Sequence, residues 1–124
     1  MEVIAKARIE IEAMRLMVLR AARAMDLTGN AEARIWVSAV KAMVPVRVCE
    51  IIDEAIQIHG ATGISNWTPL AGMYAGARTL RLADGPDEVH WHVVGRAELT
   101  RYEDDHAPIV GPGSGRGGRF SGPA

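Results

Sequence analysis

Apolar residues recur through the first 26 residues at alternating intervals of three and four, which is the spacing of one helical face. A second apolar row runs beside the first, so we expect this helix to contact neighbours on more than one side. The run 26–30, which contains Gly29, predicts the end of the helix. The first row comprises Ile4, Ala7, Ile11, Met14, Val18, Ala21 and Met25, and the second comprises Ile9, Ala13, Leu16 and Leu19.

A second helical pattern begins near Asn30, which can cap a helix N-terminus, and places Glu32 in the first turn. Pro45 interrupts this pattern, because proline removes a backbone donor and clashes with the preceding turn. The apolar spacing keeps its phase across Pro45, so we expect one kinked helix rather than two separate ones. The stripe comprises Val37, Val40, Val44, Val48, Ile51, Ala55 and Ile58.

The run 60–63, Gly-Ala-Thr-Gly, ends the second helix, and the stretch to Trp67 lacks periodicity and predicts an ordered loop. Thr68 and Pro69 then supply an N-cap and a proline at the first helical position. A third helix follows. Its apolar stripe comprises Leu70, Met73, Tyr74, Ala77 and Leu80.

The sequence Asp84-Gly85-Pro86 predicts a turn, in which Gly85 can take a positive φ and Pro86 can open the next helix. Asp87 and Glu88 then lie in the first turn of a fourth helix, where negative charge is favourable. The positions of this helix that we expect to face inward are Val89, Val93, Ala97 and Thr100.

Four helical patterns without a predicted strand indicate an all-α fold, namely an antiparallel four-helix bundle over residues 1–103. The residues that follow have a different composition. From 104 to 124, eleven of twenty-one residues are Gly, Pro or Ser, so this segment has little apolar surface to offset its ordering entropy. We therefore expect a flexible, disordered tail at 104–124.

The composition, 48% hydrophobic and 23% charged over 124 residues, indicates a single globular domain. Such a chain is too short to combine a complete cofactor-binding domain with a separate substrate domain. The formal charge is −1 and the basic residues are scattered, which argues against nucleic-acid binding. No long uncharged apolar run exists, so we expect no membrane span. Cys49 is the single cysteine and no signal peptide is recognisable, so we expect a cytoplasmic protein with a structural Cys49.

The histidines do not indicate a metal centre. His90 and His92 lie about 200° apart around one helix and cannot share an ion. Asp87 and His90 have a suitable spacing, but a di-metal bundle needs a second such pair and further carboxylates. No second pair exists, so we expect no metal site.

Two short motifs are open to a structural and a functional interpretation. The run 60–63 matches no phosphate-binding fingerprint and by pattern is a helix C-cap with a second glycine. Alternatively, its backbone amides and the Gln57 side chain hold phosphate oxygens of a ligand. Asp84 is either a turn residue that caps the following helix or a general base above the bundle.

Three stretches, residues 57–63, 69–71 and 78–90, closely resemble the C-terminal helical domain of acyl-CoA dehydrogenases. They read Gln-Ile-His-Gly-Ala-Thr-Gly, Pro-Leu-Ala and Arg-Thr-Leu-Arg-Leu-Ala-Asp-Gly-Pro-Asp-Glu-Val-His. The resemblance extends over about residues 3–102, since Ile4 to Glu10 also looks like the long helix of that family. The nearest subgroup is the long-chain type, some of whose members are fused to a kinase-like phosphotransferase module.

The resemblance implies an FAD enzyme of fatty acid β-oxidation that removes the α-proton and the β-hydride from a fatty acyl-CoA. The product is a trans-2-enoyl-CoA, and electrons pass to an electron-transfer flavoprotein. Asp84 matches the catalytic base, Gly85 matches a residue that touches the substrate, and Pro86, Asp87 and Glu88 match positions that line the flavin. Gln57, Gly60, Ala61 and Gly63 match a loop that reaches the adenine diphosphate end of FAD held by a neighbouring subunit.

The sequence departs from the family pattern at three of these positions. Asp84 is one methylene shorter than the usual glutamate, so the carboxylate falls short unless the turn is displaced. Pro86 replaces a threonine and lacks both a hydroxyl and a backbone donor. Ala61 replaces a glycine, which requires a negative φ at that position.

The family builds its flavin site from an N-terminal helical domain, a middle β-domain and this bundle, and the sequence matches only the bundle without its first helix. We therefore expect apolar faces on the first two helices that seek a partner. That partner is another copy of the chain or a chain that carries the other two domains. The alternative function is a non-catalytic module for oligomerisation or assembly, in which Asp84 only caps a helix.

Overall fold

The computed structural model of the chain describes residues 1–103, and all of its regular secondary structure is helical. The helices are α1 (Glu2–His59), α2 (Ala61–Ile64), α3 (Leu70–Thr79) and α4 (Asp87–Glu103). The predicted all-α class is therefore confirmed. The predicted tail, 104–124, lies outside the described residues.

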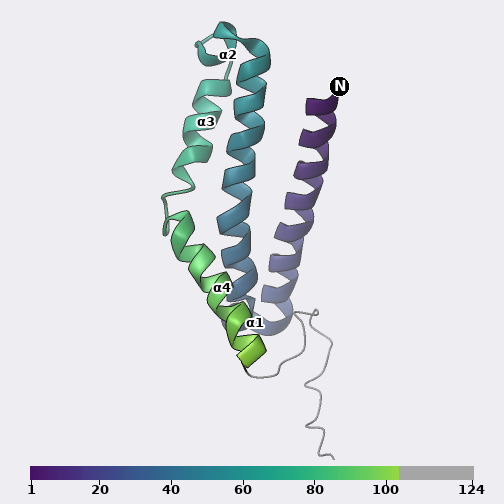
Figure 1. Cartoon of the computed structure of the whole chain (residues 1–124), viewed down its shortest axis with the longest axis vertical. Coiled ribbons are helices and arrows are strands. Elements are labelled where there is room, and N and C mark those ends of the chain that lie inside the picture. Colours follow the sequence, from purple (N-terminus) through teal and green to yellow (C-terminus); the bar gives the residue numbers. More distant parts are fainter. Residues whose placement is uncertain (104–124) are drawn as a thin grey trace, which may run out of the picture.

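Helix α1 consists of two antiparallel arms, residues 2–28 and 30–59, which meet at Gly29 (Figure 1). Gly29 has φ 78° and ψ 177°, a backbone conformation that is almost restricted to glycine. The two arms are the first and second predicted helices. The reversal takes one non-helical residue rather than the whole predicted run 26–30, because Thr28 stays helical and its hydroxyl donates to the Ala24 carbonyl at 2.7 Å.

Small side chains fill the buried positions of α1. Ala33 and Ala42 are fully buried, and Ala21 and Ala24 are nearly so, which lets helix backbones approach closely. Polar contacts also join the two arms. The Arg20 guanidinium lies 4.5 Å from the centre of the Trp36 ring, and Arg47 Nε lies 3.8 Å from a Glu10 carboxylate oxygen. Packing in the hairpin therefore depends on alanines, with charged side chains joining the arms.

Pro45 lies inside the second arm of α1 and is buried. Among the residues of this helix, non-helical torsion angles occur at Gly29 and not at Pro45. The predicted continuity of the helix through Pro45 is therefore confirmed, whereas the predicted kink gives no departure from helical torsion angles at that residue.

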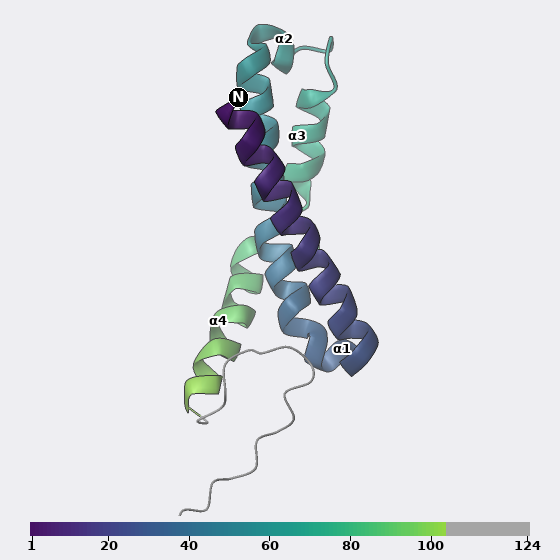
Figure 2. The same cartoon turned by 90° about the vertical axis from the view of Figure 1, so that its right-hand side faces the viewer.

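Helices α3 and α4 both pack on α1 and, within residues 1–103, do not pack against one another. They run one after the other beside the second arm, as the two perpendicular views show (Figures 1 and 2). The core under α3 is small and consists of Cys49, Ile52 and Ala77, with Val48, Ile56 and Tyr74 packed against it. Cys49 is thus a buried packing residue, as predicted.

Two local predictions between the second arm and α3 are wrong. The stretch that follows Gly60 is not entirely a loop, since Ala61–Ile64 forms the short helix α2. Thr68 does not cap α3, whose N-cap residue is Pro69 without a side-chain cap. The reason is that the Thr68 hydroxyl donates to the Gly63 carbonyl at 3.1 Å, so it serves the end of α2 instead.

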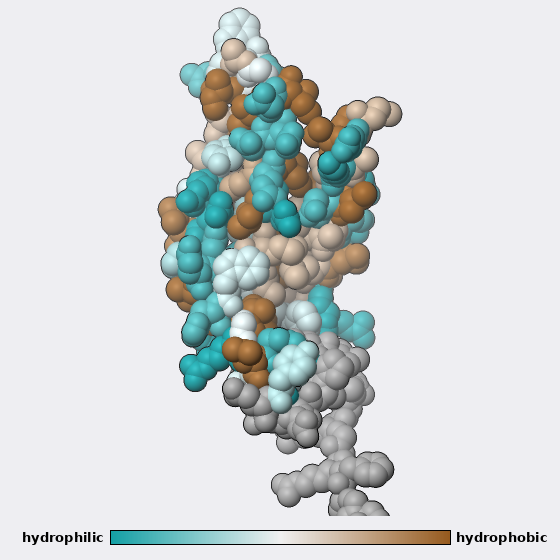
Figure 3. Space-filling view, viewed as in Figure 1, coloured by the Kyte–Doolittle hydropathy of each residue, from teal (hydrophilic) through white to brown (hydrophobic). Residues whose placement is uncertain are grey.

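Much apolar surface stays uncovered in this part of the chain. No large side chain of residues 1–103 is fully buried, and Ile4 and Leu16 of the first arm are 68% and 63% exposed. Figure 3 shows one face, with hydrophobic side chains in brown between hydrophilic ones in teal. The expected unpartnered apolar faces are therefore present on the first arm. None of the described helices combines the length and the apolar character needed to span a bilayer.

The Gly29 turn provides a test of the fold. We expect Gly29→Ala to lower the free energy of unfolding by about 1–3 kcal/mol, because alanine is strained at that φ and ψ. The matched control is Gly76→Ala within α3, where an added Cβ meets open space. That variant should gain about 0.5–1 kcal/mol from the lower flexibility of its unfolded chain. Urea unfolding followed by circular dichroism measures both, and equal stabilities of the two variants would contradict the assigned turn.

Candidate functional site

The connection between α3 and α4 has an unusual backbone. Asp84 and Gly85 lie in succession at φ 55° and φ 100°, and Asp84 is the one non-glycine residue of 1–103 with a positive φ. Aspartate tolerates this region better than most residues do. The turn leaves Asp84 exposed. Pro86 directly precedes α4, which begins one residue later than predicted, and its carbonyl accepts from the Val89 amide at 3.0 Å.

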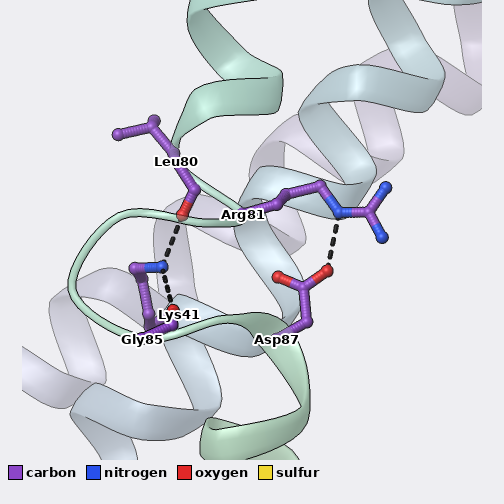
Figure 4. Close-up of polar contacts among 5 residues, drawn as sticks. All are labelled: Lys41, Leu80, Arg81, Gly85 and Asp87. Carbon is purple, nitrogen blue, oxygen red and sulfur yellow. Dashed lines mark hydrogen bonds and ion pairs between the residues drawn. The ribbon is translucent and has the colours of Figure 1, made fainter.

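Asp87, the first residue of α4, is only 7% exposed and forms an ion pair across the turn. Its Oδ2 lies 2.6 Å from Arg81 Nε (Figure 4). This hydrogen bond is the main cause that raises the pKa of Arg81 above its ordinary value. The other carboxylate oxygen, Oδ1, is buried without a partner in this part of the chain. The pair holds the start of α4 against the residues that follow α3.

Lys41 reaches the same turn from the second arm of α1. Its Nζ donates to the carbonyl of Leu80 and, at 3.3 Å, to the carbonyl of Gly85 (Figure 4). These two carbonyls stand at the beginning and the end of the connection. The ammonium group therefore ties the turn to the longest helix of the molecule.

His90 is the third side chain that contacts the turn. Its Nε2 lies 3.2 Å from the Asp84 carbonyl oxygen, and its Nδ1 is buried without a partner among the described residues. Gly85 is confined by this ring, because a Cβ at Gly85 would lie 3.3 Å from His90 Nε2. The positive φ therefore favours glycine at position 85, and a larger residue would also require the His90 ring to shift.

The second candidate site is the loop that follows α1. Gly60 has φ 58°, and its amide donates to the Gln57 carbonyl at 3.2 Å. Gly63 is buried, and a Cβ there would lie 2.6 Å from the Ile56 carbonyl oxygen. Ala61 does not have a positive φ, so the backbone accepts alanine at the position where the family has glycine. Glycine is thus favoured at position 60 by its positive φ and at position 63 by its close approach to α1.

This loop also presents groups to solvent. Gln57, Gly60 and Ala61 are exposed, while the Gly63 amide donates to the Gly60 carbonyl at 2.9 Å. The amides of both glycines are thus used within the loop. A shallow groove of about 370 Å³ lies beside them, lined by Ala61, Thr62, Ser65 and Trp67.

The structure does not bring the two candidate sites together. They lie at opposite ends of α3, whose ten residues correspond to about 15 Å of helix. Asp84, Gly85 and Asp87 gather at one end, with Pro86 and Glu88 exposed beside them, and the residues of 57–63 gather at the other. A single bound molecule would have to be long to touch both sites of one chain.

Three residues of the turn site, Lys41, Arg81 and His90, were not predicted from the sequence. Arg81 and Asp87 carry opposite charges on either side of the turn, which is a signal that could have indicated their pairing. Lys41 gives no such signal, since its partners lie 39 and 44 residues away. Within residues 1–103, no group of three or more His, Cys, Asp or Glu side chains is arranged to hold a metal ion.

Comparison with known proteins shows the family to which this chain belongs. The family described as "Acyl-CoA dehydrogenase, C-terminal domain" matches residues 2–99. The chain belongs to the acyl-CoA dehydrogenase family. The resemblance in the sequence is thereby confirmed, and the match includes both candidate sites.

Individual acyl-CoA dehydrogenase relatives support this assignment. "Acyl-CoA dehydrogenase family member 11" of Rattus norvegicus is 53% identical over 96 residues, which are 77% of this chain and 12% of the rat protein. "Probable acyl-CoA dehydrogenase FadE2" of Mycobacterium tuberculosis is 47% identical over 109 residues, or 88% of this chain and 27% of that protein. The chain thus spans about an eighth to a quarter of the length of these relatives.

A solved structure agrees with them. A protein from Mycobacterium abscessus assigned to the acyl-CoA dehydrogenases superimposes with a TM-score of 0.79 at 52% identity. The superposition covers 82% of this chain and 25% of that one.

The close approach at Gly63 gives a test of the loop. We expect Gly63→Ala to destabilise the chain by about 1–3 kcal/mol, because the new Cβ clashes with the backbone at Ile56. Gly95→Ala in α4 is the matched control, since its Cβ meets nothing within 4 Å. The readout is the free energy of unfolding in urea. A Gly63→Ala variant as stable as the wild type would show that the loop does not pack against α1 as described.

Proposed function

We propose that the chain supplies the general base of an FAD-dependent acyl-CoA dehydrogenase, which converts a fatty acyl-CoA to a trans-2-enoyl-CoA. The observation that carries this proposal is the Asp84 carboxylate. It stands exposed on a left-handed turn whose backbone is held by Lys41 and His90, at the position that matches the base of the family.

The role of Asp84 is to accept a proton. In the proposed reaction the α-carbon of the acyl-CoA loses its proton to the carboxylate, while the β-carbon loses a hydride and the carbon–carbon double bond forms. FAD, when bound, supplies the acceptor of that hydride. The carboxylate is exposed in this chain, so a substrate held by the rest of the enzyme can reach it and exclude water from it.

The residues that follow Asp84 are the ones that we propose to lie along the flavin. Gly85 carries no side chain beside Asp84, and Pro86 and Glu88 are exposed next to it. Asp87 is turned toward Arg81, and its buried Oδ1 lacks a partner within residues 1–103. We therefore assign Asp87 to support of the flavin-lining turn, and Pro86 and Glu88 to contact with the cofactor.

The loop at the far end of α3 fits the adenine diphosphate end of an FAD held by a neighbouring subunit. Gly60 and Gly63 use their amides within the loop, so Gln57 and the exposed backbone at Ala61 are the groups that we propose for the phosphate oxygens. Because the resemblance assigns this loop to the FAD of a neighbouring subunit, we propose that one chain contacts two different FAD molecules, one at each end of α3.

Activity also requires parts of the enzyme that this chain does not cover, because it spans 12% to 27% of the relatives. We propose that the N-terminal and middle domains of the family complete the site and that the assembly contains several copies of the chain. The proposed substrate is an acyl-CoA and the proposed electron acceptor is an electron-transfer flavoprotein.

A second candidate function is a non-catalytic module for oligomerisation or assembly. The observation that favours it is the exposed apolar surface of the first arm, which includes Ile4 and Leu16. Both functions need partners for this surface. They differ in whether the assembled protein binds flavin.

Flavin content separates the two functions. We expect the chain, assembled with the N-terminal and middle domains, to take up FAD and to show flavin absorbance after gel filtration. An assembly that forms with the same stoichiometry but stays colourless in excess FAD would support the non-catalytic module and contradict the dehydrogenase.

Replacement of the carboxylate tests the base. In the assembled enzyme, Asp84→Asn should reduce formation of enoyl-CoA by about 10²–10⁴-fold and leave the flavin content unchanged, because an amide cannot accept the α-proton. The matched control is Glu2→Gln, an exposed carboxylate that pairs with Lys6 at 2.6 Å far from the turn. Turnover of Asp84→Asn at the wild-type rate would contradict the assignment of the base.

A further inference from the structure

Lys41 holds the connection that carries Asp84 at both of its ends. Its ammonium group donates to the carbonyls of Leu80 and Gly85, which come directly after α3 and directly after Asp84 (Figure 4). Among residues 1–103, no other side chain of α1 donates a hydrogen bond to this connection. The other polar contacts, Arg81 with Asp87 and His90 with Asp84, are local to the turn.

The backbone of the turn needs such a restraint. Asp84 has φ 55°, which costs an aspartate conformational energy, and Gly85 beside it has the widest choice of conformations of any residue. Helices α3 and α4 do not pack against one another, so the turn gains no rigidity from a contact between them. A link to α1 therefore fixes where the turn stands.

The hydrogen bonds of Lys41 indicate that it positions the backbone of the Asp84 turn. Lys41 Nζ has three donors and uses two of them on backbone carbonyls of the connection. Its contacts are to the main chain that presents the carboxylate, so Lys41 acts on where Asp84 stands. A carboxylate on the shorter side chain of aspartate has less reach than glutamate, so the position of its backbone matters more.

We propose that Lys41 is a positioning residue for Asp84, which holds the 80–85 connection so that the carboxylate reaches the α-carbon of the substrate. This inference rests on the proposed function and deepens it. Under this inference Lys41 acts on Asp84 through the carbonyls of Leu80 and Gly85, and not by contact with the substrate or the cofactor.

The variant that tests the inference is Lys41→Met, which keeps the length of the side chain and removes the donors. In the assembled enzyme we expect kcat to fall about 10- to 100-fold with little change in KM or flavin content, as expected for a misplaced reacting group. Lys41→Arg, which retains a cation with several donors, should recover part of this loss. Lys6→Met is the control, because Lys6 is the other lysine and lies exposed on the first arm.

An isotope effect separates positioning from a general loss of structure. With substrate deuterated at the α-carbon, the isotope effect on kcat should rise in Lys41→Met, because proton transfer to Asp84 becomes rate-limiting. A variant with only a smaller folded fraction would keep the isotope effect of the wild type. An unchanged isotope effect, or an unchanged kcat, in an active wild-type background would overturn the inference and leave the proposed function standing.

Hydrogen exchange of the chain itself measures the contact without turnover. Amides of 80–85 should exchange faster in Lys41→Met than in the wild type or in Lys6→Met, while the amides of the second arm keep their protection. Equal exchange rates in the three proteins would overturn the restraint. Absence of turnover in the wild-type assembly would instead refute the proposed function, so the two failures are distinguishable.

Discussion

The second arm of α1 is the support on which the rest of the described chain depends. The first arm folds back on it at Gly29, and α2, α3 and α4 all contact α1, whereas α3 and α4 do not contact one another. Few large side chains of residues 1–103 are buried in this packing, and most of the buried apolar residues are alanines. The first arm, α3 and α4 thus pack on the second arm in an all-α helical bundle, as predicted.

The candidate active site is a consequence of this arrangement. Because α3 and α4 attach separately to α1, the connection between them can leave the helical path and expose Asp84 on a left-handed turn. The ion pair of Arg81 with Asp87 and the contacts of Lys41 and His90 then restrict the conformations of that turn. The backbone that presents the carboxylate is thus fixed by polar contacts, while apolar packing fixes the helices on either side.

Periodic spacing was sufficient to predict the two arms of α1, α3 and α4, since packing on one face imposes that spacing. The prediction includes the continuity of the second arm through Pro45. The short helix α2 was missed because four residues are too few for a period. The role of Thr68 was missed because its hydroxyl serves the preceding carbonyls. The residue pattern indicated Asp84 and the run 57–63 as open alternatives, and the resemblance supplied their roles and added Gly85, Pro86, Asp87 and Glu88. Neither periodicity nor resemblance indicated Lys41, because a contact across 39 residues of chain leaves no local pattern.

The glycine loop and the Asp84 turn lie at opposite ends of α3. This arrangement determines how one defective copy affects an assembly of several copies. Under the proposed function, each copy contributes its carboxylate to one catalytic centre and its loop to the cofactor of the next. One damaged copy in a mixed assembly would then impair two centres by different routes, one through chemistry and one through flavin retention. Loss of activity would exceed the proportion of damaged copies, which is the behaviour of a dominant-negative allele.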